Sequence, residues 1–283
     1  MLPAHRDELV ALFGRGPVAV ISGAGLSTGS GIPAYRDRDG QWQHAQPVRH
    51  QDFLASAATR RRYWARSFAG WPTMAGARPN AAHAALAALE SAGRISTLIT
   101  QNVDGLHHAA GSRRVIELHG GIRGVRCLAC AVCYPRSGMQ EWLARANPAF
   151  DPATARHART APDGDAHLAE SAYADFRVPD CPACGGTLKP DVVFFGDNVP
   201  RDRVADAAAA VEASAALLVV GSSLMVYSGY RFAEQAHRLG KPVAAINQGT
   251  MRADALLALK VDADCTAALP ALAEALSATP VTA

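Results

Sequence analysis

Residues 18–36 read V-A-V-I-S-G-A-G-L-S-T-G-S-G-I-P-A-Y-R and decide the fold. The apolar, β-branched start at residues 18–21 predicts a short buried strand, which ends in a turn containing Gly23 and Gly25. Two glycines after such a strand let backbone N–H groups approach a phosphate, so we expect a nucleotide-binding turn. No third glycine at the usual spacing follows, but a small polar run at residues 27–31 does. This run predicts a loop that folds over a ligand.

The rest of the chain alternates helical and strand patterns. Apolar periodicity predicts helices at residues 3–14, 50–70, 80–92, 201–214 and 229–239. Short apolar runs predict further strands at residues 95–99, 115–118, 216–220, 243–246 and 261–264. Repeated β–α alternation is typical of an α/β fold with a Rossmann-like, doubly wound parallel sheet.

Composition bounds the function classes. The chain has 283 residues with 49% hydrophobic composition, which is enough for one large α/β core and a smaller module. A net charge of only +3 gives no case for nucleic acid or a membrane surface as the main partner. The sequence contains no run of about 18 apolar residues, so we expect no membrane span. Asp7 and Glu8 in the first turns argue against a targeting peptide, so we expect a cytoplasmic protein.

Small or polar side chains follow several predicted strands at the edge where parallel sheets bind ligands. They are Gln101, Asn102, Asp104, His119, Ser222, Ser223, Asn247 and Gln248. Two of them have simpler interpretations that remain open. Asp104 also fits the start of a capped helix, and a lone histidine such as His119 is more often a core residue than a catalyst.

Two C-x-x-C pairs predict a metal site. Cys127 and Cys130 form the first pair, and Cys181 and Cys184 form the second. Four thiolates at this spacing are typical of tetrahedral zinc and fill its coordination shell, so this ion is structural. Cys133 is an alternative ligand, and a disulfide is the weaker interpretation in a chain without a leader.

These observations predict one domain with an inserted smaller lobe. The Rossmann-like core takes in about residues 1–37, 79–122 and 190–283. The helical insertion at about 38–78 and the zinc module at about 123–189 form the lobe, and the stretch between the cysteine pairs is long enough to approach the site.

In this order the motifs resemble those of the sirtuins, the Sir2 family of NAD-dependent protein lysine deacylases. The motifs are G-A-G-L-S-T-G-S-G-I-P, T-Q-N-V-D-G-L-H, E-L-H-G, the cysteine pairs, K-P-D-V-V-F-F-G-D, V-G-S-S-L and I-N. R-Y-W-A-R-S-F, A-P-D-G-D and V-Y-S-G-Y-R-F further resemble a class II branch of the family. Ala34 departs from the pattern, because the family commonly has an acidic residue there.

The resemblance implies a cosubstrate site for NAD+ along the strand ends. The implied residues are Gly23, Ala24, Gly25, Ser27, Thr28, Ile32, Pro33, Tyr35, Arg36, Gln101, Asn102, Val103, Asp104, Gly221, Ser222, Ser223, Asn247, Gln248, Gly249 and Cys265. Nicotinamide would occupy a pocket that includes Asn102 and Asp104, both implied in catalysis, and Tyr35 and Arg36 would belong to a closing loop.

The resemblance also implies an acyl-lysine substrate on a protein or peptide; the oligomeric state is open, and we expect a monomer. Val193, Phe195 and Gly196 would line its path, and the peptide would pair as a strand with residues 194–196 and 224–226. The acyl oxygen attacks the ribose carbon that nicotinamide leaves, and His119 acts as general base. The base would activate a ribose hydroxyl to attack the resulting imidate, and addition of water would then release free lysine and O-acyl-ADP-ribose beside nicotinamide.

The acyl group is the least determined feature. Tyr63 and Arg66 lie on one face of a predicted helix and match the Y-x-x-R of desuccinylase-type sirtuins. An arginine at the end of the tunnel would pair with a carboxylate-terminated acyl group, which predicts a preference for succinyl or glutaryl over acetyl.

Other functions use parts of the same pattern. Protein mono-ADP-ribosyl transfer or plain NAD+ hydrolysis would use the same pocket and is the main alternative. A hydride-transfer dehydrogenase shares the first two glycines but needs the missing third. A zinc-ribbon nucleic-acid module explains only the cysteines.

Overall fold

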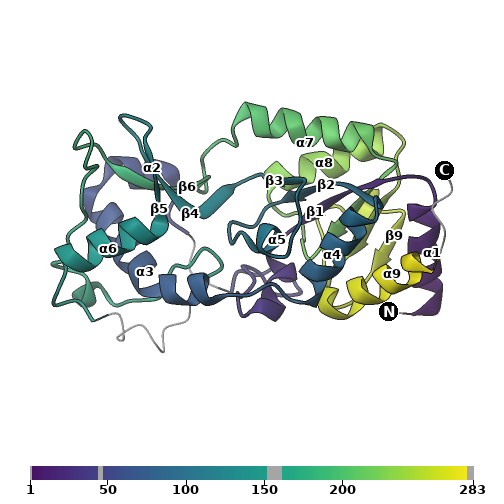
Figure 1. Ribbon diagram of the computed structural model, residues 1–283, viewed down its shortest axis with the longest axis horizontal. Coiled ribbons are helices and arrows are strands. Elements are labelled where there is room, and N and C mark those ends of the chain that lie inside the picture. Colours follow the sequence, from purple (N-terminus) through teal and green to yellow (C-terminus); the bar gives the residue numbers. More distant parts are fainter. Residues whose placement is uncertain (1, 44–46, 152–160, 279–283) are drawn as a thin grey trace.

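The computed structural model describes residues 2–43, 47–151 and 161–278. Figure 1 shows two lobes along the long axis, with both chain ends in the lobe that holds the larger sheet. None of the described helices is both long and apolar enough to cross a membrane.

The larger lobe contains a six-stranded parallel sheet, as the sequence predicts. Its strands are β1 (Val18–Ser22), β2 (Ile95–Thr100), β3 (Val115–Glu117), β7 (Ala216–Val220), β8 (Val243–Ile246) and β9 (Leu259–Val261). The order is β3-β2-β1-β7-β8-β9, and each neighbouring pair runs parallel. The connection order reverses at β1, so β1 and β7 flank the crevice where such sheets bind ligands.

Helices cover both faces of this sheet (Figure 1). One layer holds α1 (Pro3–Phe13), α4 (Ala81–Ser91) and α9 (Cys265–Ser277), and the other holds α7 (Arg201–Ala213) and α8 (Tyr227–Arg238). Side chains along β1 alternate between the layers, because strand residues point to opposite faces in turn. Val18 and Val20 pack in the first core, and Ala19 and Ile21 pack in the second.

The last predicted strand was wrong in its bounds. β9 spans Leu259–Val261, two residues earlier than the predicted start. Asp264 instead caps α9, where its side chain accepts a hydrogen bond from the Thr266 backbone N–H at 2.8 Å. A local cap therefore ends the extended run before the cavity is reached.

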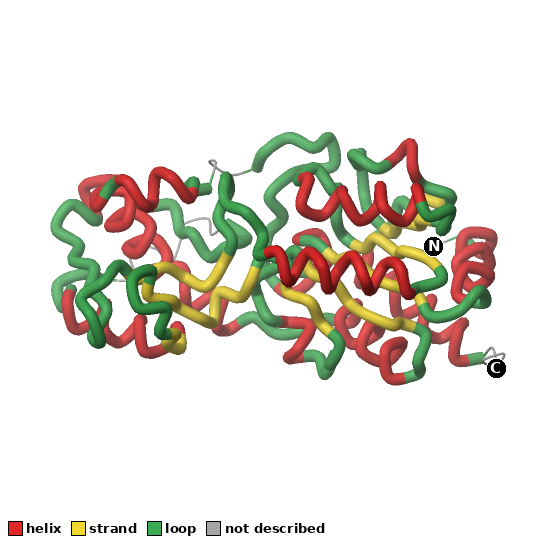
Figure 2. The backbone as a smooth tube through the Cα atoms, turned by 90° about the horizontal axis from the view of Figure 1, so that it is seen from above, coloured by secondary structure: helices red, strands yellow, loops and turns green. Residues whose placement is uncertain are grey.

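The smaller lobe joins the helical insertion to the cysteine-rich stretch. It contains α2 (His50–Ala55), α3 (Ala57–Gly76) and α6 (Arg136–Ala146) beside the antiparallel strands β4 (Gly120–Cys127), β5 (Cys133–Pro135) and β6 (Leu188–Val192). Figure 2 shows the two sheets as separate sets of strands along the molecule. The helices of the smaller lobe share one core around the fully buried Trp64. The Trp64 indole N–H donates to the Leu188 carbonyl at 3.2 Å.

Of two predictions for this lobe, the structure contradicts one and leaves the other a prediction. The single helix predicted at residues 50–70 was wrong, because Ser56 is extended (φ −126°, ψ 120°) and its side chain caps α3 through the Thr59 N–H. The predicted lobe boundaries, at about 122/123 and 189/190, fall inside β4 and β6. Those boundaries stay a prediction.

Shorter elements complete the described part of the chain. They are the 3₁₀ turns η1 (Ala24–Leu26), η2 (Thr28–Ser30), η4 (Glu170–Ala172) and η5 (Asp254–Leu256) and the one-turn helix α5 (Leu106–Ala109). The turns η1 and η2 follow β1 directly, where the sequence predicts a folded-over loop.

Candidate active site

A cavity of about 380 Å³ lies at the carboxyl ends of β1, β2, β7 and β8. The larger lobe supplies strand-end residues to its wall, and the smaller lobe supplies side chains from α3 and from residues 162–165. The volume is within the range of small-molecule sites. The sheet therefore places its ligand crevice against the smaller lobe.

The turns after β1 and β7 lie in direct backbone contact at the floor of the cavity. The Gly25 N–H donates to the Gly221 carbonyl at 2.9 Å. A Cβ added at Gly23 would come within 2.7 Å of Ser222 Cβ, and Gly221 has a φ of +58°, which favours glycine. The glycines let the two turns meet, and this leaves backbone groups at the cavity surface for a phosphate.

Nearly all the predicted NAD+ residues line this one cavity. They are Gly23, Ala24, Gly25, Ser27, Thr28, Ile32, Tyr35, Arg36, Gln101, Asn102, Val103, Asp104, Gly221, Ser222, Ser223, Asn247, Gln248 and Cys265. Pro33 and Gly249 are not in the wall. Their assignment as NAD+ contacts stays a prediction, like that of the residues that do line it.

Gly249 has a structural task beside the cavity. Its φ is +81°, and an added Cβ would collide with the Arg38 backbone. The neighbouring Thr250 N–H donates to the Arg38 carbonyl at 2.9 Å. This contact docks the loop after Arg36 on the β8 edge, and it supplies an anchor where Ala34 lacks the family's acidic side chain.

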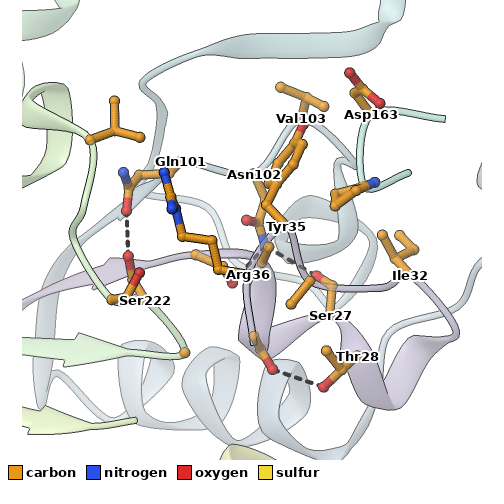
Figure 3. A pocket seen from close by; sticks show the side chains of 18 of the residues that line it. Ser27, Thr28, Ile32, Tyr35, Arg36, Gln101, Asn102, Val103, Asp163 and Ser222 are labelled. Carbon is orange, nitrogen blue, oxygen red and sulfur yellow. Dashed lines mark hydrogen bonds between the residues drawn. The ribbon is translucent and has the colours of Figure 1, made fainter. Parts of the chain in front are cut away.

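Aromatic packing holds the same loop over the cavity. The Arg36 guanidinium lies 4.2 Å from the centre of the Trp42 ring and donates to the Gly40 carbonyl at 2.7 Å. Tyr35 and Trp42 each make edge contacts with Phe195, at ring distances of 6.0 and 5.7 Å. Figure 3 shows Tyr35 and Arg36 at the same opening as Gln101 and Asn102. The loop thus closes on the segment that is predicted to hold the substrate.

Asn102, Ser27 and Asp104 form a buried hydrogen-bond chain in the cavity wall. The Asn102 carboxamide N–H group donates to the Gly23 carbonyl and to Ser27 Oγ, both at 3.1 Å. Ser27 Oγ donates in turn to Asp104 Oδ2 at 2.7 Å. The other Asp104 oxygen accepts the Leu106 N–H at 2.9 Å, so the helix-cap interpretation of Asp104 holds alongside its place in the wall.

His119 faces the cavity between β3 and β4 in a defined tautomer. Its Nδ1 lies 2.9 Å from the Gln101 carbonyl oxygen, which only accepts, so Nδ1 carries the proton. Nε2 is then the acceptor and receives the Ser228 hydroxyl at 2.8 Å. Burial, with the charge of Arg203, lowers the pKa of His119 below 6.5. The imidazole is therefore neutral and basic at physiological pH.

The predicted acyl-lysine residues do not all reach the cavity. Val193, Phe195 and Tyr63 line it, whereas Gly196 and Arg66 do not. The Gly196 carbonyl instead accepts a hydrogen bond from the Gln51 side-chain amide at 2.7 Å. Arg66 Nε lies 2.6 Å from Asp165 Oδ1 in an ion pair, so the structure does not bring its guanidinium to the wall.

Sequence reasoning missed several residues of the wall. The most informative are Arg38, Trp42, Pro162, Asp163 and Asp165. Pro162 to Asp165 belong to the stretch between the cysteine pairs, so that stretch does reach the site. The motif A-P-D-G-D carried a signal, since two carboxylates beside a glycine turn are unusual in a featureless insertion.

The four predicted zinc ligands form one cluster. The sulfur atoms of Cys127, Cys130, Cys181 and Cys184 all lie within 4.8 Å of one another, with Cys127–Cys184 at 3.5 Å and Cys130–Cys181 at 3.8 Å. A tetrahedron with Zn–S bonds of about 2.3 Å has sulfur atoms about 3.8 Å apart, so the cluster fits the ion. Cys133 is exposed, lies outside the cluster and donates to the Ala131 carbonyl.

The Sir2 family model matches residues 23–228 of the chain. The chain is a member of the Sir2 family. The match runs from the first glycine of the turn to Ser228 at the His119 ring, so it includes the glycine turns, the Asn102 chain, His119 and the cysteine cluster.

Curated relatives of this sirtuin carry a matching name. An NAD-dependent protein deacetylase of Xanthomonas campestris pv. campestris is 57% identical over 250 residues, which is 88% of this chain and 84% of the relative. NAD-dependent protein deacetylase 2 of Bradyrhizobium diazoefficiens is 55% identical over 250 residues, with 88% and 90% of the two chains covered.

Solved Sir2 structures share the fold of this sirtuin. A Sir2 complex with a p53 peptide and NAD+ superposes with a TM-score of 0.75 at 29% identity, covering 96% of this chain and 99% of the other. A Sir2 bound to acetylated peptide gives 0.74 at 28%, with the same coverage.

Proposed function

We propose that this sirtuin uses NAD+ and one water molecule to remove acetyl and related acyl groups from protein lysines, giving nicotinamide, O-acyl-ADP-ribose and free lysine. One observation carries the proposal. His119 presents a neutral imidazole in the same cavity that joins the glycine turns to Val193 and Phe195. The names of the deacetylase relatives and the NAD+ and acetylated-peptide complexes of other Sir2 proteins support it.

The larger lobe binds and orients the dinucleotide. The glycine turns offer backbone donors to its pyrophosphate, and Ser222 is held toward the cavity by its hydrogen bond to Gln101 Oε1 at 2.7 Å. When bound, NAD+ supplies the ribose carbon from which nicotinamide departs and to which the acyl oxygen is transferred. The Asn102–Ser27–Asp104 chain keeps the nicotinamide pocket in one conformation.

His119 supplies the general base. Its Nδ1–H is fixed on the Gln101 carbonyl, so Nε2 is the atom that accepts a ribose hydroxyl proton. The Ser228 hydroxyl occupies Nε2 in this structure and must turn aside when that hydroxyl arrives. A neutral base at pH 7 is what this step requires.

The acyl-lysine enters between the lobes. Val193 and Phe195 line the passage, and the flanking peptide pairs as an added strand with residues 194–196 and 224–226. This pairing fits any extended substrate, so side chains deeper in the cavity select the acyl group.

The test is a mass-spectrometric assay of NAD+ with acetyl-lysine peptide. Wild type is expected to give nicotinamide and O-acetyl-ADP-ribose in equal amounts, and His119→Ala is expected to lose both by about 10²–10⁴-fold. Nicotinamide without acyl transfer, or ADP-ribose attached to protein, would instead favour the hydrolase or transferase alternative.

We also propose a cytoplasmic location. Its support is the group of four free thiols placed to hold zinc, because such a cluster is typical of a reducing compartment. Fractionation of the native host would test it.

A further inference from the structure

The inner wall of the cavity carries two carboxylates. Asp163 and Asp165 line it together with Tyr63 of α3, and Figure 3 shows Asp163 on the wall beside Val103. The Tyr63 ring packs 5.1 Å from the Phe194 ring. In the sequence Phe194 lies between Val193 and Phe195, the two residues predicted to line the acyl-lysine passage. These carboxylates therefore stand where the end of an acyl chain would point.

Arg66, which lies behind that wall, is already paired. Arg66 lies one helical turn after Tyr63, and its Nε is 2.6 Å from Asp165 Oδ1. The same Nε donates to the Ala166 carbonyl at 2.8 Å, and the Ala166 N–H donates back to the Arg66 carbonyl at 3.3 Å. Both charged side chains are nearly buried, at 13% and 12% exposure. The loop is thus fastened to α3, with Asp165 between Arg66 and the cavity.

We propose that Asp165 is a specificity-determining residue: it occupies the Arg66 guanidinium that a carboxylate-terminated acyl group would need, and so restricts this sirtuin to uncharged acyl groups such as acetyl and propionyl. The inference rests on the proposed deacylase function. A succinyl or glutaryl carboxylate entering the wild-type cavity meets two carboxylates, and the charge of Arg66 is already neutralised by Asp165. Like charges placed together in a desolvated site are strongly disfavoured.

The charge balance of the wall supports this assignment. Burial and the Asp163 carboxylate raise the pKa of Asp165 to about 7, although Arg66 and Arg62 act to lower it. The ionised form of Asp165 is therefore already disfavoured in this wall, and a third carboxylate, from the substrate, would be disfavoured further.

The first experiment compares kcat/KM for acetyl-, propionyl- and succinyl-lysine in one peptide sequence. Wild type is expected to favour acetyl over succinyl by at least about 100-fold. Asp165→Asn keeps the shape but removes the carboxylate charge that neutralises Arg66, so it is expected to cut this ratio at least about tenfold by raising the succinyl rate. Adding Arg66→Met to Asp165→Asn is expected to restore the discrimination. Asp175→Asn, an exposed change in the same insertion, is the matched control.

A second measurement uses wild type alone and does not depend on a variant folding. Asp165 is faced by Asp163, Arg66, Arg62, Tyr63 and Tyr35, and its protonation between pH 8.5 and 6 would release Arg66. The succinyl-to-acetyl ratio is therefore expected to rise several-fold as pH falls. Titration of the general base affects both peptides alike and cancels in the ratio.

The outcomes separate this inference from the proposed function. A wild type that prefers succinyl, an Asp165→Asn ratio like that of Asp175→Asn, or a ratio independent of pH would each overturn the role of Asp165. Absence of acyl transfer from every peptide would overturn the proposed function instead.

Discussion

Replacing Ser27 by alanine tests the hydrogen-bond chain that holds the nicotinamide side of the cavity. Ser27 is fully buried, and its hydroxyl both donates to Asp104 Oδ2 at 2.7 Å and accepts from the Asn102 amide at 3.1 Å. Asp104 is itself only 5% exposed. Alanine therefore leaves a buried carboxylate oxygen without this donor and the amide without one acceptor.

The cost follows from these two bonds. A hydrogen bond to a charged group contributes about 1.5–3 kcal/mol and a neutral one about 0.5–1.5 kcal/mol, so Ser27→Ala should destabilise the fold by about 2–4 kcal/mol. For a lobe of about 150–250 residues each kcal/mol lowers Tm by about 2–4 °C, which gives a fall of about 4–16 °C. Because Asn102 loses a restraint, KM for NAD+ should also rise, by about tenfold if 1.4 kcal/mol of the loss falls on the bound state.

The assay is thermal unfolding of Ser27→Ala beside Thr28→Ala, together with NAD+ kinetics of Ser27→Ala beside wild type. Thr28 is the next residue, and its hydroxyl makes an exposed hydrogen bond to the Gly25 carbonyl at 3.0 Å. The control should change stability by no more than about 0.5 kcal/mol. If Ser27→Ala melts within about 2 °C of Thr28→Ala, the chain contributes little and the reasoning is refuted.

Three further predictions concern the base, the metal and the turn. Ser228→Ala removes a donor that favours the neutral imidazole, so the acidic limb of kcat/KM, set by the lowered pKa of His119, should move to higher pH; an unmoved limb would show that the hydroxyl does not act on the ring. Cys184→Ser or strong chelation should unfold the smaller lobe and abolish peptide binding, because structural zinc supplies about 10–16 kcal/mol, whereas Cys133→Ser should behave as wild type in circular dichroism and activity. Gly221→Ala should raise KM for NAD+ with little effect on acyl-peptide binding, because its added Cβ collides with backbone of the turn after β1. Calorimetry with each ligand alone is the measurement, and equal weakening of both ligands would contradict the prediction.

Local pattern was sufficient for most elements of the larger lobe. The strand and glycine turn at residues 18–25 follow from periodicity and from the backbone freedom of glycine, which are properties of adjacent residues. The strand ends at Asn102 and Ser222 reach one cavity because parallel strands must share a carboxyl edge. The helix break at Ser56 and the early end of β9 escaped prediction, because single side-chain caps decide them.

The sequence by itself determined the zinc ligands, because two C-x-x-C pairs allow few other geometries. It also placed His119 after a strand, but only the tertiary structure decided which ring nitrogen carries the proton and which accepts a hydrogen bond, through Gln101 and the Ser228 hydroxyl 109 positions away. The same holds for Arg66, which the helix pattern aims toward an acyl carboxylate. A loop 100 positions later returns to α3 and gives it Asp165 instead. Such partners are set by packing between distant segments, and no local spacing encodes them.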